Sequence, residues 1–294
     1  MIGKRALITG ALGFTGRYMS AELRSAGYEV FGTGSQAIES SNYYQADLSN
    51  MQSLARVIAE VRPDVVVHLA ALAFVAHGDA DAIYKVNLIG SRNLLEALSQ
   101  SSYRPSKVLV ASSANVYGNQ NEELLTELSP VAPANDYAVS KLAMEFLAKT
   151  YIDRLPIVIA RPFNYTGVGQ DQKFLIPKIV KHFRQRAPNI ELGNVDVWRD
   201  FNDVRSVVRA YCGLIDSGVA GQTYNIASGT TYSLREVIDL CTELTGHAIQ
   251  ISVNPAFVRA NEVKTLSGDI SKLRAVIADW NPLELRETLS WMLS

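Results

Sequence analysis

The chain has 294 residues, of which 48% are hydrophobic and 19% are charged, and its formal net charge is -1. This length is sufficient for one large domain or two small ones, and the composition is that of an ordinary soluble globular protein. The near-neutral charge gives no field that would favour nucleic acid or an anionic membrane. No apolar run approaches the roughly 20 residues that span a bilayer, so no membrane partner is expected.

The cysteines and histidines suggest neither a disulfide framework nor a metal site. Cys212 and Cys241 are the only cysteines. Both fall in helical patterns, and the N-terminus leads straight into a strand pattern without a signal segment, so we expect a reducing, cytoplasmic setting. No metal is predicted, because no metal-ligand spacing is found among the histidines, which are His68, His77, His182 and His247.

The first 160 residues alternate short apolar runs with helical patterns. Strands are predicted at residues 5–9, 29–33, 65–69, 107–111 and 157–160, and helices at 14–26, 51–61, 81–100 and 136–151. Gly27 is the expected end of the first helix, and Ser49 or Asn50 the cap of the second. This alternation predicts an α/β fold with a doubly wound, parallel Rossmann sheet and right-handed crossovers.

The last 130 residues are less regular. Helices are predicted at 174–186, at 204–215 and from a cap at Ser233 to about 244, with a short strand at 223–226 and a candidate strand pair at 195–201 and 249–253. We expect a smaller, discontinuous C-terminal substrate domain. The predicted division is a dinucleotide-binding domain at 1–162 plus roughly 200–227, and a substrate domain at roughly 163–199 and 228–294.

Three glycines follow the first predicted strand. Gly10, Gly13 and Gly16 have the order Gly-x-x-Gly-x-x-Gly, which differs from the standard dinucleotide fingerprint. Such glycines allow a tight turn and close approach of the backbone to a pyrophosphate, while the helix N-terminus offers free N–H groups. We therefore expect a nucleotide site here; an ordinary glycine-rich turn is the alternative.

The end of the second predicted strand bears on the choice of dinucleotide. Residues 31–36 read Phe-Gly-Thr-Gly-Ser-Gln, without the acidic residue that NAD enzymes use for the ribose hydroxyls. Ser35 and the guanidinium of Arg17 are candidate donors to a 2′-phosphate. The alternative for Arg17 is a surface residue on the first turn of the helix. NADP(H) is therefore favoured and NAD(H) remains open. Asp47 is an acceptor for the adenine amino group, a turn residue or a helix cap.

A tyrosine and a lysine four residues apart form the candidate catalytic pair. Tyr137 and Lys141 would lie on one face of a helix, where an ammonium favours the phenolate and lowers the phenol pKa. An exposed tyrosine beside a solvated lysine is the alternative. Ser112 and Ser113 follow the fourth predicted strand, and the carboxyl ends of parallel strands face the ligand crevice. Either hydroxyl is placed to contact a substrate oxygen, and a capping or core hydroxyl is the alternative.

Together with the glycine turn and the run His-Leu-Ala-Ala at 68–71, these residues resemble the extended short-chain dehydrogenase/reductase family of nucleotide-sugar epimerases, dehydratases and reductases. The resemblance implies that Tyr137 is the general acid/base, that Lys141 holds the nicotinamide ribose, and that Ser113 is the active-site hydroxyl. Asn87 resembles a structural asparagine near the active site, or is a plain surface amide. The implied cofactor contacts also include Phe14, Leu48, Leu69, Ala70 and Ala71.

Departures from the family pattern narrow the reaction. In 4,6-dehydratases an Asp-Glu pair follows the strand-four hydroxyl, whereas Ala114 and Asn115 stand here, so dehydratase activity is not expected. Segments 161–170, 198–205, 224–229 and 268–273 are similar to GDP-4-dehydro-6-deoxy-D-mannose reductases. The implied contacts to the nucleotide sugar are Asn164, Arg199, Arg259 and Glu262. For the two arginines, a surface ion pair is the alternative.

The sequence therefore predicts an NADPH-dependent nucleotide-sugar 4-ketoreductase that acts on an NDP-4-keto-6-deoxyhexose. Residues 259–262 read Arg-Ala-Asn-Glu where the family often has Arg-Pro-x-Asp. The sequence therefore does not decide whether the base of the nucleotide is guanine or thymine. The alternatives are an epimerase with bound NAD and a non-catalytic NADP(H)-sensing protein. We expect a homodimer through the helices at 81–100 and 136–151, unless the apolar side chains of Leu142, Phe146 and Leu147 pack inside the monomer.

Overall fold

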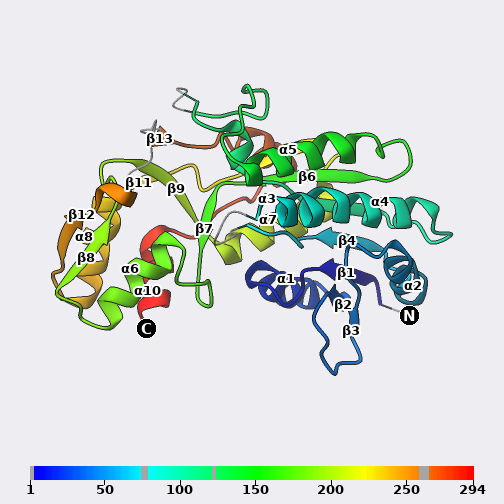
Figure 1. Ribbon diagram of the computed structural model, residues 1–294, viewed down its shortest axis with the longest axis horizontal. Helices are drawn as coiled ribbons and strands as arrows, with labels where there is room; N and C mark the ends of the chain where they lie inside the picture. Colours follow the sequence, from blue (N-terminus) through cyan, green and yellow to red (C-terminus); the bar gives the residue numbers. More distant parts are fainter. Residues whose placement is uncertain (1–2, 74–78, 121–123, 258–264) are drawn as a thin grey trace.

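The computed structural model describes residues 3–73, 79–120, 124–257 and 265–294. At its centre is a seven-stranded sheet in which every neighbouring pair is parallel, in the order β10-β6-β5-β4-β1-β2-β3 (Figure 1). The predicted parallel Rossmann sheet is thus confirmed. Its strands are β1 (Arg5–Thr9), β2 (Glu29–Gly34), β3 (Tyr43–Gln45), β4 (Val65–His68), β5 (Lys107–Ala111), β6 (Ile157–Pro162) and β10 (Thr223–Ile226).

Helices cover both faces of this sheet because consecutive strand residues point to opposite sides. Leu7, on β1, belongs to a core shared with α2 (Met51–Val61), α4 (Ser91–Gln100) and α5 (Asp136–Lys149). The next residue, Ile8, belongs to a second core shared with α1 (Phe14–Ser25), α7 (Val204–Ser217) and α9 (Ser271–Val276). Both cores are apolar, as expected for strands that are buried on both faces.

Local signals in the sequence set several of the helix ends. Asn50, rather than Ser49, caps α2, because its side-chain oxygen accepts a hydrogen bond from the Ser53 N–H at 3.0 Å. Gly27 follows α1 with a φ of 86°, in the left-handed region that glycine adopts readily. Ser233 and Glu236 form a reciprocal capping box at the start of α8 (Leu234–Thr245).

The helix predicted at 81–100 is not uniform. It consists of α3 (Ala80–Tyr84), a π-helical turn at Lys85–Gly90, and α4. Asn87 lies in the π turn and is fully buried. Its side chain accepts a hydrogen bond from the Leu72 N–H at 2.8 Å and donates to the Leu72 carbonyl at 3.1 Å. The surface-amide interpretation of Asn87 is therefore wrong, and the turn holds this asparagine against the segment that follows β4.

The C-terminal half adds two smaller sheets and a third apolar core, on the left in Figure 1. One sheet contains β7 (Asn164–Thr166), β9 (Trp198–Asp203), β11 (Thr231–Ser233) and β13 (Thr265–Leu266), and the other contains β8 (Asn189–Leu192) and β12 (Gln250–Val253). Helices α6 (Leu175–Arg184), α8 and α10 (Leu285–Leu293) enclose the third core.

One predicted strand pairing is wrong. The segment predicted at 249–253 pairs through β12 with β8, and β9 instead joins β7, β11 and β13. The physical reason is that β8 directs the side chains of Ile190 and Leu192 into the third core, where Ile251, the register partner of Ile190 on β12, also packs. The division into two domains remains a prediction.

The structure bears on the expected chemistry of the two cysteines and on the expectation that the protein has no membrane partner. Cys212, on α7, and Cys241, on α8, are free thiols, and burial raises the pKa of each to about 12. Both are therefore thiols of low reactivity, although Cys212 is only partly buried. Within the described ranges, no helix is long and apolar enough to cross a membrane.

Candidate active site

The glycine turn between β1 and α1 presents bare backbone. Gly10 has a φ of 72°, and a Cβ placed on it would lie 2.9 Å from the Ala70 Cα, so this position requires glycine. A Cβ on Gly16 would collide with the Gly10 carbonyl. Gly13 precedes α1 without any side-chain cap. The N–H groups at the start of α1 thus fit the pyrophosphate of a dinucleotide, because the N-cap residue is a glycine and supplies no side-chain cap.

Aromatic packing joins this turn to the C-terminal half. The ring of Phe14 stacks on that of Tyr165, with centroids 6.2 Å apart and planes 13° apart. The hydroxyls of Thr15 and Tyr165 are 2.8 Å apart. Tyr165, on β7, was not singled out in the sequence, because nothing in its local pattern indicates a contact 150 residues away. This pairing places the start of β7 beside the predicted cofactor turn.

The segment after β4 forms another part of the same crevice. The Leu69 N–H donates to the Thr9 carbonyl at 3.2 Å, and the Ala70 N–H donates to the Thr9 hydroxyl at 3.3 Å. Ala71 follows and is partly exposed. The structure therefore brings residues 69–71 together with the glycine turn at the carboxyl ends of β1 and β4.

The region beyond β2 is mostly exposed. Ser35 and Arg17 are both at the surface, and the Arg17 Nε donates to the Leu12 carbonyl at 3.0 Å. Asp47 accepts a hydrogen bond from the Ser49 N–H at 2.7 Å, and this bond lowers the carboxyl pKa. Asp47 is therefore a turn residue in this structure, as its hydrogen bond to the Ser49 N–H shows. Leu48 is buried, with its side chain over Gly90.

The predicted catalytic pair lies on the first turns of α5. Asn135 caps this helix by accepting from the Ala138 N–H at 2.9 Å. Tyr137 and Lys141 follow at helical spacing, and Lys141 is only 3% exposed. The Lys141 Nζ donates to the carbonyl of Ala111, the last residue of β5, at 2.7 Å. Burial lowers the pKa of the amine to about 8, close to physiological pH.

The pKa of the Tyr137 phenol moves opposite to the predicted direction. Burial raises it above its usual value of 10, the neighbouring Tyr165 phenol adds to the rise, and a hydrogen bond with the Ser113 side chain opposes it. Desolvation of the phenolate is the largest of these causes, so it outweighs the lowering by the Ser113 hydrogen bond. Tyr137 is consequently protonated at neutral pH.

The two serines after β5 face different groups. The Ser113 side chain reaches the Tyr137 phenol and accepts a hydrogen bond from the Asn115 N–H at 3.2 Å, at the start of the 3-10 turn Ala114–Tyr117. The Ser112 hydroxyl donates to the Glu145 Oε1 at 2.5 Å. Ser113 therefore has the position expected of the active-site hydroxyl, while Ser112 supports a buried carboxylate.

That carboxylate belongs to a buried ion pair beneath the catalytic pair. Glu145 and Arg161 are 1% and 5% exposed, and they form two hydrogen bonds, Nε to Oε1 at 2.9 Å and Nη2 to Oε2 at 2.7 Å. Arg161 also donates to the Tyr117 hydroxyl at 3.0 Å. The charge of Glu145 raises the pKa of Lys141, against the effect of burial. Sequence reasoning did not identify Glu145, although it follows Lys141 by one helical turn.

A chain of buried hydrogen bonds links β1 to the catalytic helix. The Thr9 hydroxyl is 2.7 Å from the His68 Nδ1, and the His68 Nε2 is 2.7 Å from the Ser91 hydroxyl. Ser91 donates to the Asn87 carbonyl at 2.6 Å, and the Asn87 amide donates to the Ser140 hydroxyl at 3.0 Å. Because Ser91 donates to Asn87, it accepts from His68. Burial lowers the pKa of His68 to about 3, so the ring is neutral.

The residues assigned to the nucleotide sugar are partly placed by the structure. Asn164 is exposed at the start of β7 and pairs in register with Phe201 on β9. Arg199 lies two residues earlier on β9, where its Nη1 donates to the Trp198 carbonyl at 2.8 Å. Asn164 and Arg199 thus sit on adjacent strands. Arg259 and Glu262 lie outside the described residues.

Comparison with known proteins gives the family. The family model for GDP-mannose 4,6 dehydratase matches residues 7–290. The chain belongs to this family, within the extended short-chain dehydrogenases/reductases. It is 36% identical to GDP-6-deoxy-D-talose 4-dehydrogenase of Aggregatibacter actinomycetemcomitans, over 94% of this chain and 92% of that one. It is 34% identical to GDP-6-deoxy-D-mannose reductase of Pseudomonas aeruginosa, over 99% and 96%.

Solved structures of similar proteins agree with this membership. A Burkholderia cenocepacia J2315 protein, provisionally assigned as an epimerase, has a TM-score of 0.94 and 50% identity, over 99% and 97% of the two chains. RMD from Pseudomonas aeruginosa, complexed with NADPH, has a TM-score of 0.87 and 32% identity over the same shares. MoeE5, complexed with UDP-glucuronic acid and NAD, has a TM-score of 0.87 and 27% identity, over 98% and 97%. Both NADPH and NAD thus occur in solved structures of similar proteins.

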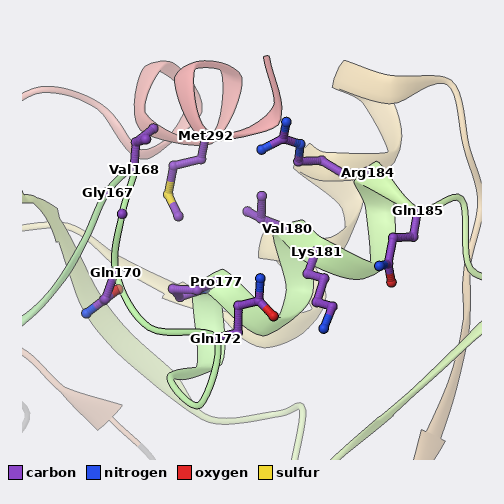
Figure 2. A pocket seen from close by; sticks show the side chains of 11 residues that line it. Gly167, Val168, Gln170, Gln172, Pro177, Val180, Lys181, Arg184, Gln185 and Met292 are labelled. Carbon is purple, nitrogen blue, oxygen red and sulfur yellow. The ribbon is translucent and has the colours of Figure 1, made fainter.

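Figure 2 shows another hollow, of about 360 Å³. It is lined by the loop at 167–172, by one face of α6 and by Met292 of α10. Its two cations, Lys181 and Arg184, belong to the last turn of α6, where positive charge offsets the helix dipole. None of the residues assigned above to the cofactor or the substrate lines this hollow, so we assign no function to it.

Proposed function

We propose that the protein is an NADP(H)-dependent nucleotide-sugar 4-ketoreductase. Its substrate is an NDP-4-keto-6-deoxyhexose, either GDP-4-dehydro-6-deoxy-D-mannose, reduced to GDP-D-rhamnose, or a dTDP analogue. The observation that carries this proposal is the group at the carboxyl end of β5: a protonated Tyr137 in contact with the Ser113 side chain, one helical turn from the buried amine of Lys141. This group suits the transfer of one proton to a carbonyl oxygen.

The protein's own residues then have defined roles. When bound, the nicotinamide supplies the hydride for C4. Tyr137 donates its phenol proton to the oxygen that forms at C4, and Ser113 hydrogen-bonds the same oxygen and orients it. Lys141, whose pKa is about 8, offers the positive charge that stabilises the phenolate left after the transfer. A reductase requires no further proton-transfer group.

The positions after Ser113 support reduction over dehydration. Ala114 is buried and apolar, and Asn115 is an exposed amide. Neither side chain transfers a proton, whereas the elimination of water from a hexose requires a second acid/base pair. We therefore place the protein among the reductases of a family whose model is named after a dehydratase.

The nucleotide sugar is proposed to bind between the crevice and the C-terminal half. Asn164 and Arg199 lie on adjacent strands near the start of β7, where an amide and a guanidinium suit a diphosphate. Arg259 and Glu262 are proposed to contact the nucleotide as well. The two curated relatives both carry GDP-sugar names and, at 34% and 36% identity, support guanine over thymine.

The test is turnover with matched substrates. We expect the purified protein to oxidise added NADPH when it receives GDP-4-dehydro-6-deoxy-D-mannose, and to do so more slowly with the dTDP-4-keto-6-deoxyhexose. Co-purified NAD without consumption of NADPH would instead indicate the 4-epimerase, which the similarity to the Burkholderia protein favours. Binding of NADP(H) without turnover of either sugar would indicate the sensing protein.

A homodimer is proposed through the outer face of α5 and the π turn beside it. Leu142 and Leu147 pack against the two cores of the monomer. Phe146 and Val139, seven residues apart on α5, are 59% and 37% exposed, and Ile89 on the π turn is 43% exposed. These three apolar side chains suit a partner surface, and a second copy is the partner that the sequence predicted.

Phe146→Asp is expected to weaken this association at least tenfold, because the burial of an aromatic ring contributes about 1.5–3 kcal/mol. Light scattering across a concentration series would show a shift from dimer to monomer. Leu128→Asp is the matched control, since Leu128 is 95% exposed and lies outside the two helices. An unchanged mass for the Phe146 variant would remove this face from the interface.

We propose a cytoplasmic location. Cys212 and Cys241 are both free, which agrees with a reducing compartment.

A further inference from the structure

The side chain of Tyr43 lies across the end of β2. Tyr43 begins β3, which pairs in parallel with β2 and places Gly32 opposite Tyr43. A Cβ built on Gly32 would be 3.0 Å from the Tyr43 Cδ2, and one built on Gly34 would be 2.7 Å from the Tyr43 hydroxyl. Because residues two apart on a strand share a face, the ring runs along the face of both glycines. Their lack of side chains makes room for it.

This face is also the face of the cofactor turn. The Cβ built on Gly32 would lie 2.6 Å from the Ala11 Cβ, and the Gly10 N–H donates to the Thr33 carbonyl at 2.9 Å. Tyr43 is therefore next to the turn assigned to the pyrophosphate. In NAD enzymes of this architecture, the end of the second strand carries the acidic residue that binds the adenosine ribose 2′-hydroxyl.

The Tyr43 hydroxyl stands where such an acid would act. Its distance from the Cβ position of Gly34 is close to the distance between the Cβ and the carboxylate oxygens of an aspartate. Among the described residues, no hydrogen-bond partner is found for this hydroxyl, and the residue is partly exposed. Burial raises the phenol pKa, so the group is neutral and able to donate. A carboxylate only accepts hydrogen bonds and repels a phosphate.

We propose that Tyr43 replaces this acidic residue and that its hydroxyl donates a hydrogen bond to the 2′-phosphate of NADP(H). The inference rests on the proposed function to the extent that the protein must bind this cofactor. Arg17 supplies the positive charge: it is exposed on the first turn of α1, and no carboxylate partner for it is found in the described part of the chain. The phenol supplies a directional hydrogen bond to the phosphate, and the guanidinium supplies positive charge.

Binding of 2′,5′-ADP and 5′-AMP, measured by calorimetry, tests the role of Tyr43 without any turnover. These two probes differ only in the 2′-phosphate. Tyr43→Phe keeps the ring over the two glycines and removes the hydroxyl, so we expect the Kd for 2′,5′-ADP to rise at least tenfold and the Kd for 5′-AMP to change less than threefold. NADPH and NADH should show the same selective loss.

Tyr44→Phe is the matched control. Tyr44 is the next residue on β3, packs against the opposite core beside Phe31, and should bind both probes as the wild type does. If Tyr43→Phe changed the Kd for the two probes equally, or changed neither Kd, the proposed role of Tyr43 would be overturned. The proposed function would still stand in that case. Failure of the wild-type protein to bind NADPH, NADH or either probe would overturn the proposed function itself.

Discussion

Tyr137→Phe is expected to lower kcat at least a hundredfold while NADPH binding persists, because a positioned general acid contributes about 10²–10⁴ in rate. The variant keeps the ring and removes only the proton that reduction consumes. Burial holds this phenol protonated, and the Ser113 side chain reaches it, so no rearrangement is needed before the transfer. Steady-state kinetics with the 4-keto sugar, together with NADPH titration by fluorescence, would measure both parameters.

Tyr84→Phe is the control for this substitution. The Tyr84 hydroxyl donates to the Asp136 Oδ1 at 2.9 Å, next to Tyr137 in the chain but in an exposed contact. It should leave kcat within about twofold of the wild type. If Tyr137→Phe retained a kcat of similar size, the acid would have to be another group, and the reductase mechanism would lose its proton donor.

Glu145→Gln is expected to destabilise the protein by about 3 kcal/mol or more, because it leaves the buried Arg161 guanidinium without its counter-charge. The substitution keeps the size of the side chain, so the loss arises from charge and hydrogen bonding. Urea denaturation would measure it. Glu243→Gln is the matched control, since the Glu243–Arg286 pair is exposed and should contribute less than about 1 kcal/mol. Equal losses in the two variants would contradict a special role for the buried pair.

The Glu145→Gln substitution should also shift the pH dependence of kcat. Glu145 raises the pKa of Lys141, so its neutralisation lowers that pKa below the present value of about 8. The ammonium is lost as pH rises through its pKa, and kcat should therefore fall at a lower pH in Glu145→Gln than in the wild type. A merely structural role would leave the midpoint of this fall in place, as Glu243→Gln is expected to do.

The sheet was predictable because its strands carry their own signals. The run that became β4 is short and almost wholly apolar, and the run that became β1 has the apolar centre Ala6-Leu7-Ile8, as strands buried on both faces require. β3 was missed, since three residues at a sheet edge, Tyr43–Gln45, have too little pattern to distinguish them from a loop. The pairing of β12 with β8 was missed for another reason: register between distant segments depends on the core that they share.

The site was predictable where its geometry is local. Tyr137 and Lys141 share one helix, and the glycines share one turn, so spacing alone brought them together. The contacts of Tyr165 with Thr15 and of Arg161 with Glu145 join separate elements, and no spacing encodes them. The direction of the Tyr137 pKa was wrong for a related reason, because the degree of desolvation depends on neighbours supplied by the whole fold.

The neutral ring of His68 has one more consequence. Both of its nitrogens are within hydrogen-bond distance of hydroxyl groups, and its pKa of about 3 lies far below neutral pH. Acidification from neutral pH to about pH 5 therefore adds no proton to His68 and creates no buried charge between the first strand and α5. Mild acid therefore leaves the hydrogen bonds of His68 between β1 and Ser91 unchanged, and any acid sensitivity of the enzyme must originate in other groups.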